Sequence, residues 1–142
     1  MDLLFILRDA QASSLLGTMR VATEAQRAGK QVAVLFTGEA LAALTGGVFL
    51  WPTGLQGQEL RLTMADQGRA MGLPLLGRGE GRQLHATASI EEARQAGVRL
   101  LACPLWTALL NAEGRLPQGV VRVEMGELLQ MLEQARQVIG SF

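Results

Sequence analysis

The chain of 142 residues has one cysteine, one histidine and no excess of either charge, with thirteen acidic and thirteen basic residues. A single cysteine cannot form an intramolecular disulfide, so packing must hold the fold together and nothing points to an oxidising compartment. We therefore expect a cytoplasmic protein. Because the charges balance, the chain lacks the basic surface typical of nucleic-acid and anionic-membrane binders, and we expect neither nucleic acid nor membrane among its partners.

Long apolar runs and the common cofactor motifs are also missing. The apolar start at residues 3–7 is too short to span a bilayer and has no basic leader, so we expect a first strand there. His85 and one cysteine cannot supply the four ligands of a structural metal site, and we expect no metal and no cofactor. The glycines between Thr37 and Gly47 are not followed by Lys and Ser or Thr, and no Gly-x-Gly-x-x-Gly follows the first strand, which argues against nucleotide binding.

What is present is an alternation of short apolar runs with amphipathic segments, which is typical of βαβ units. We expect strands at residues 3–8, 31–37, 98–102, 119–123 and 137–142. Helices are expected from a cap at Ser13 or Ser14 to Gly29, over 39–44, near 59–71, from a cap at Ser89 to Gly97, over 104–111 and over 127–134. With 49% hydrophobic residues, the pattern predicts one domain over residues 1–142 with a three-layer α/β/α fold. Its mostly parallel five-stranded sheet would be layered as in flavodoxins.

Three local patterns make sharper predictions. Ser89 followed by Glu92 has the spacing of a capping box at a helix start. The last helix is expected to turn four residues inward, namely Leu128, Met131, Leu132 and Ala135. Residues 46–87 hold nine of the seventeen glycines, so we expect a long, partly irregular connection of the kind that often carries function.

The cysteine, Cys103, ends the third apolar run directly before Pro104. Proline is favoured in the first turn of a helix, where its missing N–H costs nothing, so we expect Cys103 to cap a helix. Unpaired backbone N–H groups and the helix dipole favour a thiolate at that position. The alternative is an inert core thiol, because free cysteine is among the most buried residue types.

In a parallel sheet, the ligand crevice lies at the carboxyl ends of the strands. The loops expected at that edge are residues 8–14, 37–39 and 103–106. From them we expect a set of substrate-binding residues around the thiol: Arg8, Ser13, Thr37, Gly38, Pro104 and Trp106. Their hydroxyl, N–H and guanidinium groups favour an anionic sulfur.

Several of these residues have a second interpretation. Ser13 and Ser14 can be plain helix caps, and Trp106, like Trp51, can line a subunit interface rather than a pocket. His85 is expected to be solvent-exposed or hydrogen-bonded, with a nucleophilic pair to the cysteine as the alternative.

The order of several segments is informative beyond their individual motifs. These are Gly97–Cys103 before a short helix, Gly119–Val121, the terminal Gln137–Phe142, and a second strand ending in Phe36-Thr37-Gly38. In this order the chain resembles the DsrE/DsrF-like family of small sulfur-relay proteins. The resemblance covers essentially the whole chain, and residues 48–87 match least.

This resemblance implies a sulfurtransferase-like carrier in which Cys103 accepts sulfane sulfur as a persulfide and passes it to an acceptor thiol. It also implies sulfur donor and acceptor proteins as partners, and self-association as a trimer or hexamer. The residues Pro104–Trp106 are bulkier than the small residues and basic pair that follow this cysteine in the best-known carriers.

Two other functions remain open from the sequence. One is a non-enzymatic oligomeric domain that binds a small ligand or a protein and keeps Cys103 buried and inert. The other is a flavodoxin-like flavin or nucleotide binder. A peroxidase or dithiol oxidoreductase is disfavoured because no second cysteine is available to resolve a disulfide within the chain.

Overall fold

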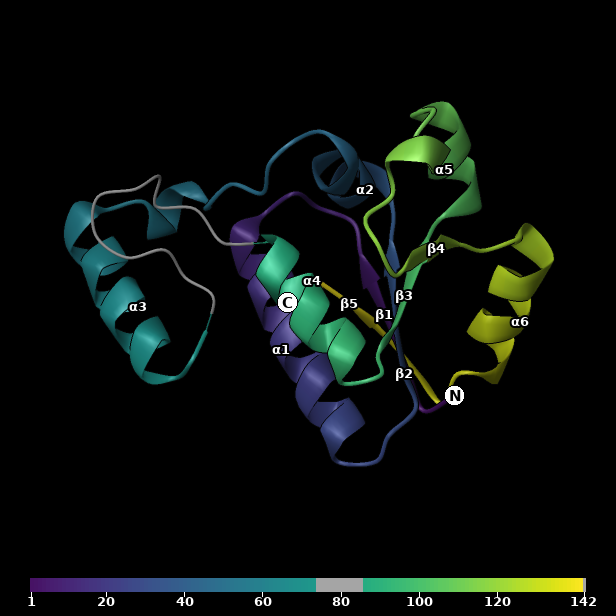
Figure 1. Cartoon of the computed structure of the whole chain (residues 1–142), viewed down its shortest axis with the longest axis horizontal. Coiled ribbons are helices and arrows are strands. Elements are labelled where there is room, and N and C mark those ends of the chain that lie inside the picture. Colours follow the sequence, from purple (N-terminus) through teal and green to yellow (C-terminus); the bar gives the residue numbers. More distant parts are fainter. Residues whose placement is uncertain (74–85, 142) are drawn as a thin grey trace.

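A parallel five-stranded sheet lies between helices in the computed structural model, which describes residues 1–73 and 86–141 (Figure 1). The strands are β1 (Leu3–Leu7), β2 (Val32–Phe36), β3 (Arg99–Ala102), β4 (Val120–Arg122) and β5 (Gln137–Gly140). The α-helices are α1 (Ala12–Arg27), α2 (Gly38–Thr45), α3 (Gln58–Ala70), α4 (Ala86–Gln95), α5 (Pro104–Leu109) and α6 (Met125–Gln134), and short 3₁₀ turns cover Thr53–Leu55 and Glu113–Arg115. The predicted three-layer α/β/α fold is confirmed.

The strand order is β4-β3-β2-β1-β5, with every neighbouring pair parallel. The three central strands consist mainly of Leu, Val, Phe and Ala because they are covered on both faces. Leu7 pairs with Phe36, and Phe36 pairs with Ala102, so β1, β2 and β3 end at the same level. The loops that follow these strands therefore start from one edge of the sheet.

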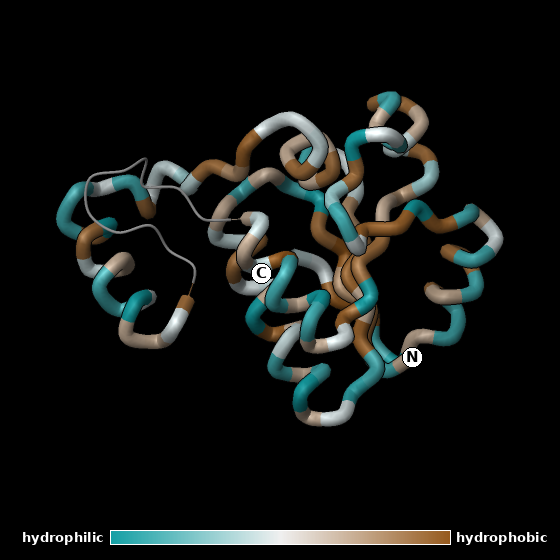
Figure 2. The backbone as a smooth tube through the Cα atoms, viewed as in Figure 1, coloured by the Kyte–Doolittle hydropathy of each residue, from teal (hydrophilic) through white to brown (hydrophobic). Residues whose placement is uncertain are grey.

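Two apolar clusters lie on opposite faces of the sheet. The larger cluster lies under α1 and α4 and contains Phe5, Val34, Phe36 and Leu100. The smaller lies under α6 and includes Leu4, Leu35, Leu101 and Cys103. Figure 1 shows α1 and α4 on one side of the sheet and α6 on the other, and Figure 2 shows the apolar strands between them.

The first helix starts without the serine cap that we expected. The residue before α1 is Gln11, whose side chain makes no capping hydrogen bond, and Ser13 lies inside the first turn. The Ala12 N–H donates to the Leu50 carbonyl at 2.8 Å, and the Leu50 N–H donates to the Ala10 carbonyl at 3.0 Å. A distant segment thus pairs with the first N–H of the helix, which begins one residue before Ser13, and the predicted cap is wrong.

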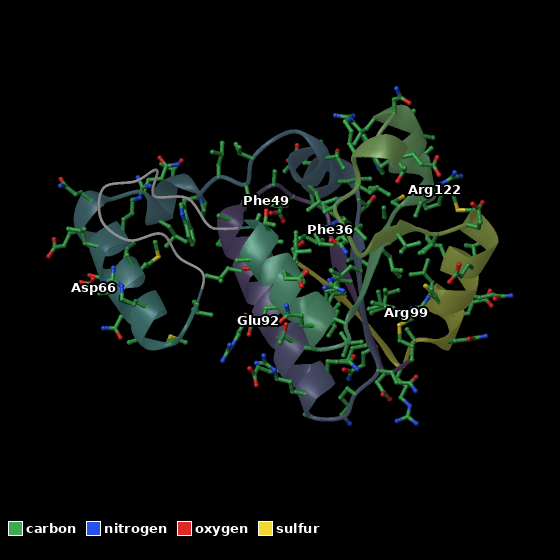
Figure 3. All side chains as sticks on the ribbon, in the orientation of Figure 1. Phe36, Phe49, Asp66, Glu92, Arg99 and Arg122 are labelled. Atoms are coloured by element: carbon green, nitrogen blue, oxygen red, sulfur yellow. The ribbon has the colours of Figure 1, made fainter. Side chains whose placement is uncertain are left out.

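The predicted capping box at Ser89 is also wrong. Helix α4 already begins at Ala86, so Ser89 lies within it and is buried against α1. Within the described residues, its hydroxyl oxygen has no hydrogen-bond partner. Glu92 instead forms ion pairs with Arg20 and Arg27 of α1, at 3.7 and 3.1 Å, and its position beside α1 is visible in Figure 3.

Helix α6 differs from expectation at one position. Leu128 and Met131 are buried under it as predicted, and Ala135, just past its end, packs against the same cluster. Leu132, predicted to face inward, is 38% exposed. Leu132 is four residues after Leu128, and each step of four residues rotates the side chain about 40° further around the helix. Leu132 therefore lies beside the buried stripe and is turned away from the sheet.

The long connection between β2 and β3 contains α3 close to its predicted range. Figure 1 shows α3 standing away from the sheet, and Leu60 and Met71 are largely exposed. Within the residues that the structure describes, no helix is long and apolar enough to cross a membrane.

Candidate functional site

At the carboxyl edge of the sheet, backbone hydrogen bonds between neighbouring chain segments continue one residue beyond the last paired residues of the strands. The Thr37 N–H donates to the Leu7 carbonyl at 3.0 Å, and the Cys103 N–H donates to the Phe36 carbonyl at 3.0 Å. On the far side, the N–H of Val123 donates to the carbonyl of Ala102 at 3.2 Å. Thr37, Cys103 and Val123 therefore lie side by side, one step beyond the ends of their strands.

Cys103 is the residue that caps α5, and Pro104 occupies the first turn. The Thr107 hydroxyl and N–H both donate to the Cys103 carbonyl, at 2.7 and 2.9 Å, which closes this first turn. Only the backbone of Cys103 takes part in the start of the helix, since its side chain makes no capping hydrogen bond. Its residue is 8% exposed and packs in the cluster beneath α6 with Leu101 and Val123.

The connections that leave β3 and β4 run to opposite faces of the sheet. After β3, the chain passes through α5 toward the α1 side, where Leu110 and Leu116 pack against the larger cluster. After β4, it enters α6 on the other face. Ligands of open α/β sheets bind at the carboxyl ends of the strands, which is the edge where these two connections part. Cys103 lies on this edge, at the start of the first of the two connections.

The Thr37 and Gly38 positions are next to the cysteine along this edge. Thr37 is extended, with φ −144° and ψ 164°, so its side chain lies on the face opposite to Phe36, as that of Cys103 lies opposite to Ala102. Neighbouring strands are about 5 Å apart, which places the threonine hydroxyl within reach of a group bound at the sulfur. The Gly38 backbone has φ +54°.

Arg8 lies one strand further along. Its carbonyl accepts the Ala40 N–H at 3.1 Å, and its own N–H donates to the Ser141 hydroxyl at 3.3 Å. Its side chain is exposed, and two strand spacings, about 10 Å, separate its backbone from that of Cys103. The backbone of Arg8 is therefore not next to that of Cys103. Its long side chain can still extend along the edge toward the cysteine.

The structure does not bring all the predicted residues together. Ser13 belongs to α1, which covers the opposite face from the Cys103 side chain. Pro104 is buried in the first turn of α5, and Trp106 is 38% exposed on the same helix. His85 lies outside the described residues.

Ser141 is a residue of this edge that sequence reasoning missed. Its hydroxyl accepts the Arg8 N–H and donates to the Ile6 carbonyl at 3.4 Å, because β5 pairs with β1 and places the end of the chain here. The terminal apolar run predicted a strand, but nothing local indicated that it would lie beside the first strand.

A cleft of about 400 Å³ lies on the other face of the sheet. It is bounded by the end of α2, the start of α4 and the turn before β4, and Phe49, Ile90 and Gln118 are among its lining residues. The thiol is not part of it, since Phe49 and Ile90 belong to the cluster on the α1 side. Within the described residues, no cluster of His, Cys, Asp and Glu could hold a metal ion.

One exposed, two-pronged ion pair borders this cleft. Arg94 donates to the Glu91 carboxylate at 2.6 and 2.8 Å, and the Gln95 amide donates to it at 2.8 Å. The Arg94 hydrogen bonds, followed by that of Gln95, lower the pKa of Glu91 to about 2. The same carboxylate raises the pKa of Arg94.

This pair predicts a specific acid dependence of stability. A carboxyl whose pKa is depressed on folding stabilises the protein above its unfolded pKa, and that contribution is lost as the pH falls toward the folded pKa. We expect Glu91 to contribute fully above pH 4.5 and to stop contributing near pH 2. Urea unfolding midpoints measured across this range should fall less in Glu91→Gln than in the natural chain. Arg94→Gln should have the same effect, and a slope unchanged in both variants would contradict the assignment.

Comparisons with known proteins reveal similarity of fold alone. No protein-family model and no curated protein matches the chain. Among solved structures, the YchN protein from E. coli is 16% identical, with 99% of each chain covered and a TM-score of 0.61. BT1422 from Bacteroides thetaiotaomicron, described as a conserved protein of unknown function, is 13% identical, with 98% of this chain and 94% of that chain covered and a TM-score of 0.57.

Proposed function

We propose that this chain is a single-domain, cytoplasmic member of the DsrE/DsrF-like family that carries sulfane sulfur on Cys103. One observation carries the proposal: Cys103 ends β3 and caps α5 at the place where the connections after β3 and β4 part to opposite faces. This is the edge of a parallel sheet at which ligands commonly bind. The order of the sequence segments supports the same family, and so does the fold shared with YchN.

The proposed reaction is a transfer of sulfur at an unchanged oxidation level. The Cys103 thiolate attacks the terminal sulfur of a donor persulfide, a new S–S bond forms at Sγ, and the donor leaves as a thiolate. An acceptor thiolate then attacks the outer sulfur, and Cys103 leaves as the thiolate. Each step exchanges one S–S bond for another, so neither an oxidant nor a second cysteine in this chain is required.

The neighbouring groups have distinct tasks in this proposal. Backbone N–H groups in the first turn of α5 and the Thr37 hydroxyl stabilise the anionic outer sulfur. Gly38 lets the loop after β2 approach the edge closely, and Pro104 starts the helix that Cys103 caps. Arg8 attracts an anionic donor along the edge. Donor and acceptor proteins, and other copies of this chain, are the proposed partners.

Sulfur loading is the direct test. The purified protein is reduced, freed of reductant, incubated with inorganic polysulfide and weighed intact. We expect the natural chain to gain the mass of one sulfur atom and to lose it again on treatment with dithiothreitol. Cys103→Ser should gain nothing. An equal gain in that variant, or no gain in the natural chain, would rule out the carrier.

Two further variants separate the tasks of the neighbours. Thr37→Val keeps the shape of the side chain but removes the hydroxyl, so we expect slower loading and faster loss of the outer sulfur. Arg8→Gln should slow loading by the anionic polysulfide and have a smaller effect on its retention, since Arg8 lies a strand further away. Identical behaviour of both variants and the natural chain would remove these residues from the site.

The burial of Cys103 favours a second candidate, a binding protein in which the thiol is a packing residue. At 8% exposure and within an apolar cluster, the side chain resembles a core residue. The rate of alkylation by iodoacetamide at neutral pH separates the candidates. Modification of the folded protein supports the carrier, and protection until the protein is unfolded in urea supports the binding protein.

A further inference from the structure

The cleft on the α1 side of the sheet reaches down to the core. Phe49 and Ile90, which line it, belong to the larger apolar cluster and are only 5% and 4% exposed. Figure 3 shows Phe49 beside the start of α4. The volume of about 400 Å³ lies within the range of about 300–1,000 Å³ that is usual for small-molecule sites. The cleft is therefore large enough for a small molecule whose apolar part packs against core side chains.

Helix α4 gives the cleft a deep apolar side and a polar mouth. Ala86 and Ile90 are four residues apart, and so are Thr87 and Glu91, so each pair lies along one stripe of the helix. All four residues line the cleft. Ile90 is buried whereas Thr87 is exposed, which places the apolar pair deeper than the polar pair. A ligand that fits this wall is apolar on one edge and polar on the other.

The Glu91 carboxylate at the mouth has an acceptor position to spare. Its Oε1 accepts hydrogen bonds from Arg94 and Gln95, and its Oε2 accepts one from Arg94. An ionised carboxylate offers about four acceptor positions, so one on Oε2 is unused within the described residues. The same hydrogen bonds hold the pKa of Glu91 at about 2, so the group is ionised at neutral pH. It is thus a fixed acceptor for an N–H group in the cleft.

The last turn of α2 adds acceptors on another side of the cleft. Ala43 and Leu44 line the cleft there, and within the described part of the chain no N–H donates to their carbonyl oxygens. The next carbonyl, that of Thr45, already accepts a hydrogen bond from Arg115 at 3.1 Å. The last carbonyls of a helix need donors from outside it, and a ligand N–H is one such donor.

The charges around the cleft balance each other. The Glu91 carboxylate is paired with the Arg94 guanidinium at 2.6 Å. The carboxyl end of α2, which carries the negative end of its dipole, and the amino end of α4, which carries the positive end, both border the cleft. An ion would lose hydration here without gaining a net opposite charge. The cleft therefore favours a neutral ligand.

We propose that this cleft binds a small, neutral nitrogen heterocycle, with its ring against Phe49 and Ile90 and its ring N–H directed to Glu91. An aromatic ring suits the apolar part because it stacks on Phe49 and has no internal rotation to lose on binding. The ring N–H supplies the donor that this acceptor-rich cleft lacks. The site lies on the opposite face of the sheet from the thiol, so it is independent of the sulfur chemistry.

Two probes of the same shape test the donor. Indole has a ring N–H, and benzofuran has an oxygen in its place. In titrations followed by the amide chemical shifts of the ¹⁵N-labelled natural chain, we expect the largest shifts at residues that line the cleft. Indole should bind at least about five-fold more tightly than benzofuran, the effect of a hydrogen bond to a charged group. Glu91→Leu should remove most of this preference. Equal affinities in the natural chain, shifts outside the cleft, or an undiminished preference in Glu91→Leu would overturn the proposal.

Filling the cleft tests the location of the site. Ala86→Phe places a ring in the cleft from the first turn of α4 and should weaken indole binding at least about ten-fold by steric exclusion. Ala88→Phe is the matched control, because Ala88 is exposed in the same turn and does not line the cleft, so it should bind indole as before. Urea midpoints confirm that both variants fold, and unchanged binding in Ala86→Phe or equal losses in both would refute the site. Cys103→Ser should bind indole normally while gaining no sulfur, so this proposal and the sulfur carrier fail separately.

Discussion

Phe36→Ala is expected to lower the free energy of unfolding by about 3–5 kcal/mol, the cost of truncating a large core side chain that leaves a cavity. Phe36 is fully buried on the central strand β2, within the cluster between the sheet and α1. Paired strands on both sides of β2 prevent the backbone from closing around the cavity. Urea unfolding followed by circular dichroism measures the loss.

Phe49→Ala is the matched control for this cavity. Phe49 is also buried, at 5% exposure, but it lines the cleft beside α2 and α4. Truncation there enlarges a space that water already enters, so we expect a distinctly smaller loss of stability. Equal losses in the two variants would show that the central strand has no special role in holding the core. Sulfur loading should persist in folded Phe36→Ala, because the Cys103 N–H bonds to its backbone carbonyl.

Element types were predictable because most segments carry a clean pattern. The apolar run at 31–37 corresponds to Val32–Phe36, and the amphipathic stretch at 59–71 corresponds to Gln58–Ala70. Gly29 and Gly97 follow the ends of helices with φ of +85° and +94°, a conformation that glycine adopts without strain. Such signals depend only on neighbouring residues, so they can be recognised from the sequence alone.

The failures come from partners that are remote in sequence. Ser13 or Ser14 was expected as a cap, but α1 begins earlier, at Ala12, whose N–H donates to the carbonyl of Leu50 far along the chain. Ser89 has a cap-like spacing, yet packing against α1 extends α4 by a turn beyond it. Leu132 was expected inside because its helix is apolar over a wide arc, and the pattern alone does not say which part of that arc meets the sheet.

The candidate site also has a part that the sequence predicted and a part that depends on remote contacts. Pro104 after an apolar run predicted that Cys103 would cap a helix, and the structure has that cap. The face on which the thiol lies depends on the strand register, and its cover depends on α6, which follows β4 and crosses to the far edge. Ser141 enters the edge only because β5 pairs with β1. Residue types indicated the chemistry, and the order of the strands determined which of them meet.

Gly38→Ala is expected to destabilise the protein by about 1–2 kcal/mol through backbone strain, with a further loss from a close contact at the candidate site. Gly38 has φ +54°, and a Cβ there would lie 3.3 Å from the Arg8 carbonyl oxygen, a backbone atom with little freedom to move. That carbonyl accepts the Ala40 N–H, so displacing it loosens the contact between the loops after β1 and β2.

Gly29→Ala separates the two causes. Gly29 has φ +85°, and a Cβ at this position would have no atom within 4 Å, so its substitution reports the strain of the backbone alone. Urea unfolding should show a larger loss for Gly38→Ala than for Gly29→Ala. The iodoacetamide reaction of Cys103 should change in the first variant and stay unchanged in the second, because only Gly38 adjoins the edge where Thr37 lies beside the cysteine. Equal losses and equal alkylation rates would mean that the approach of the two loops does not support the site.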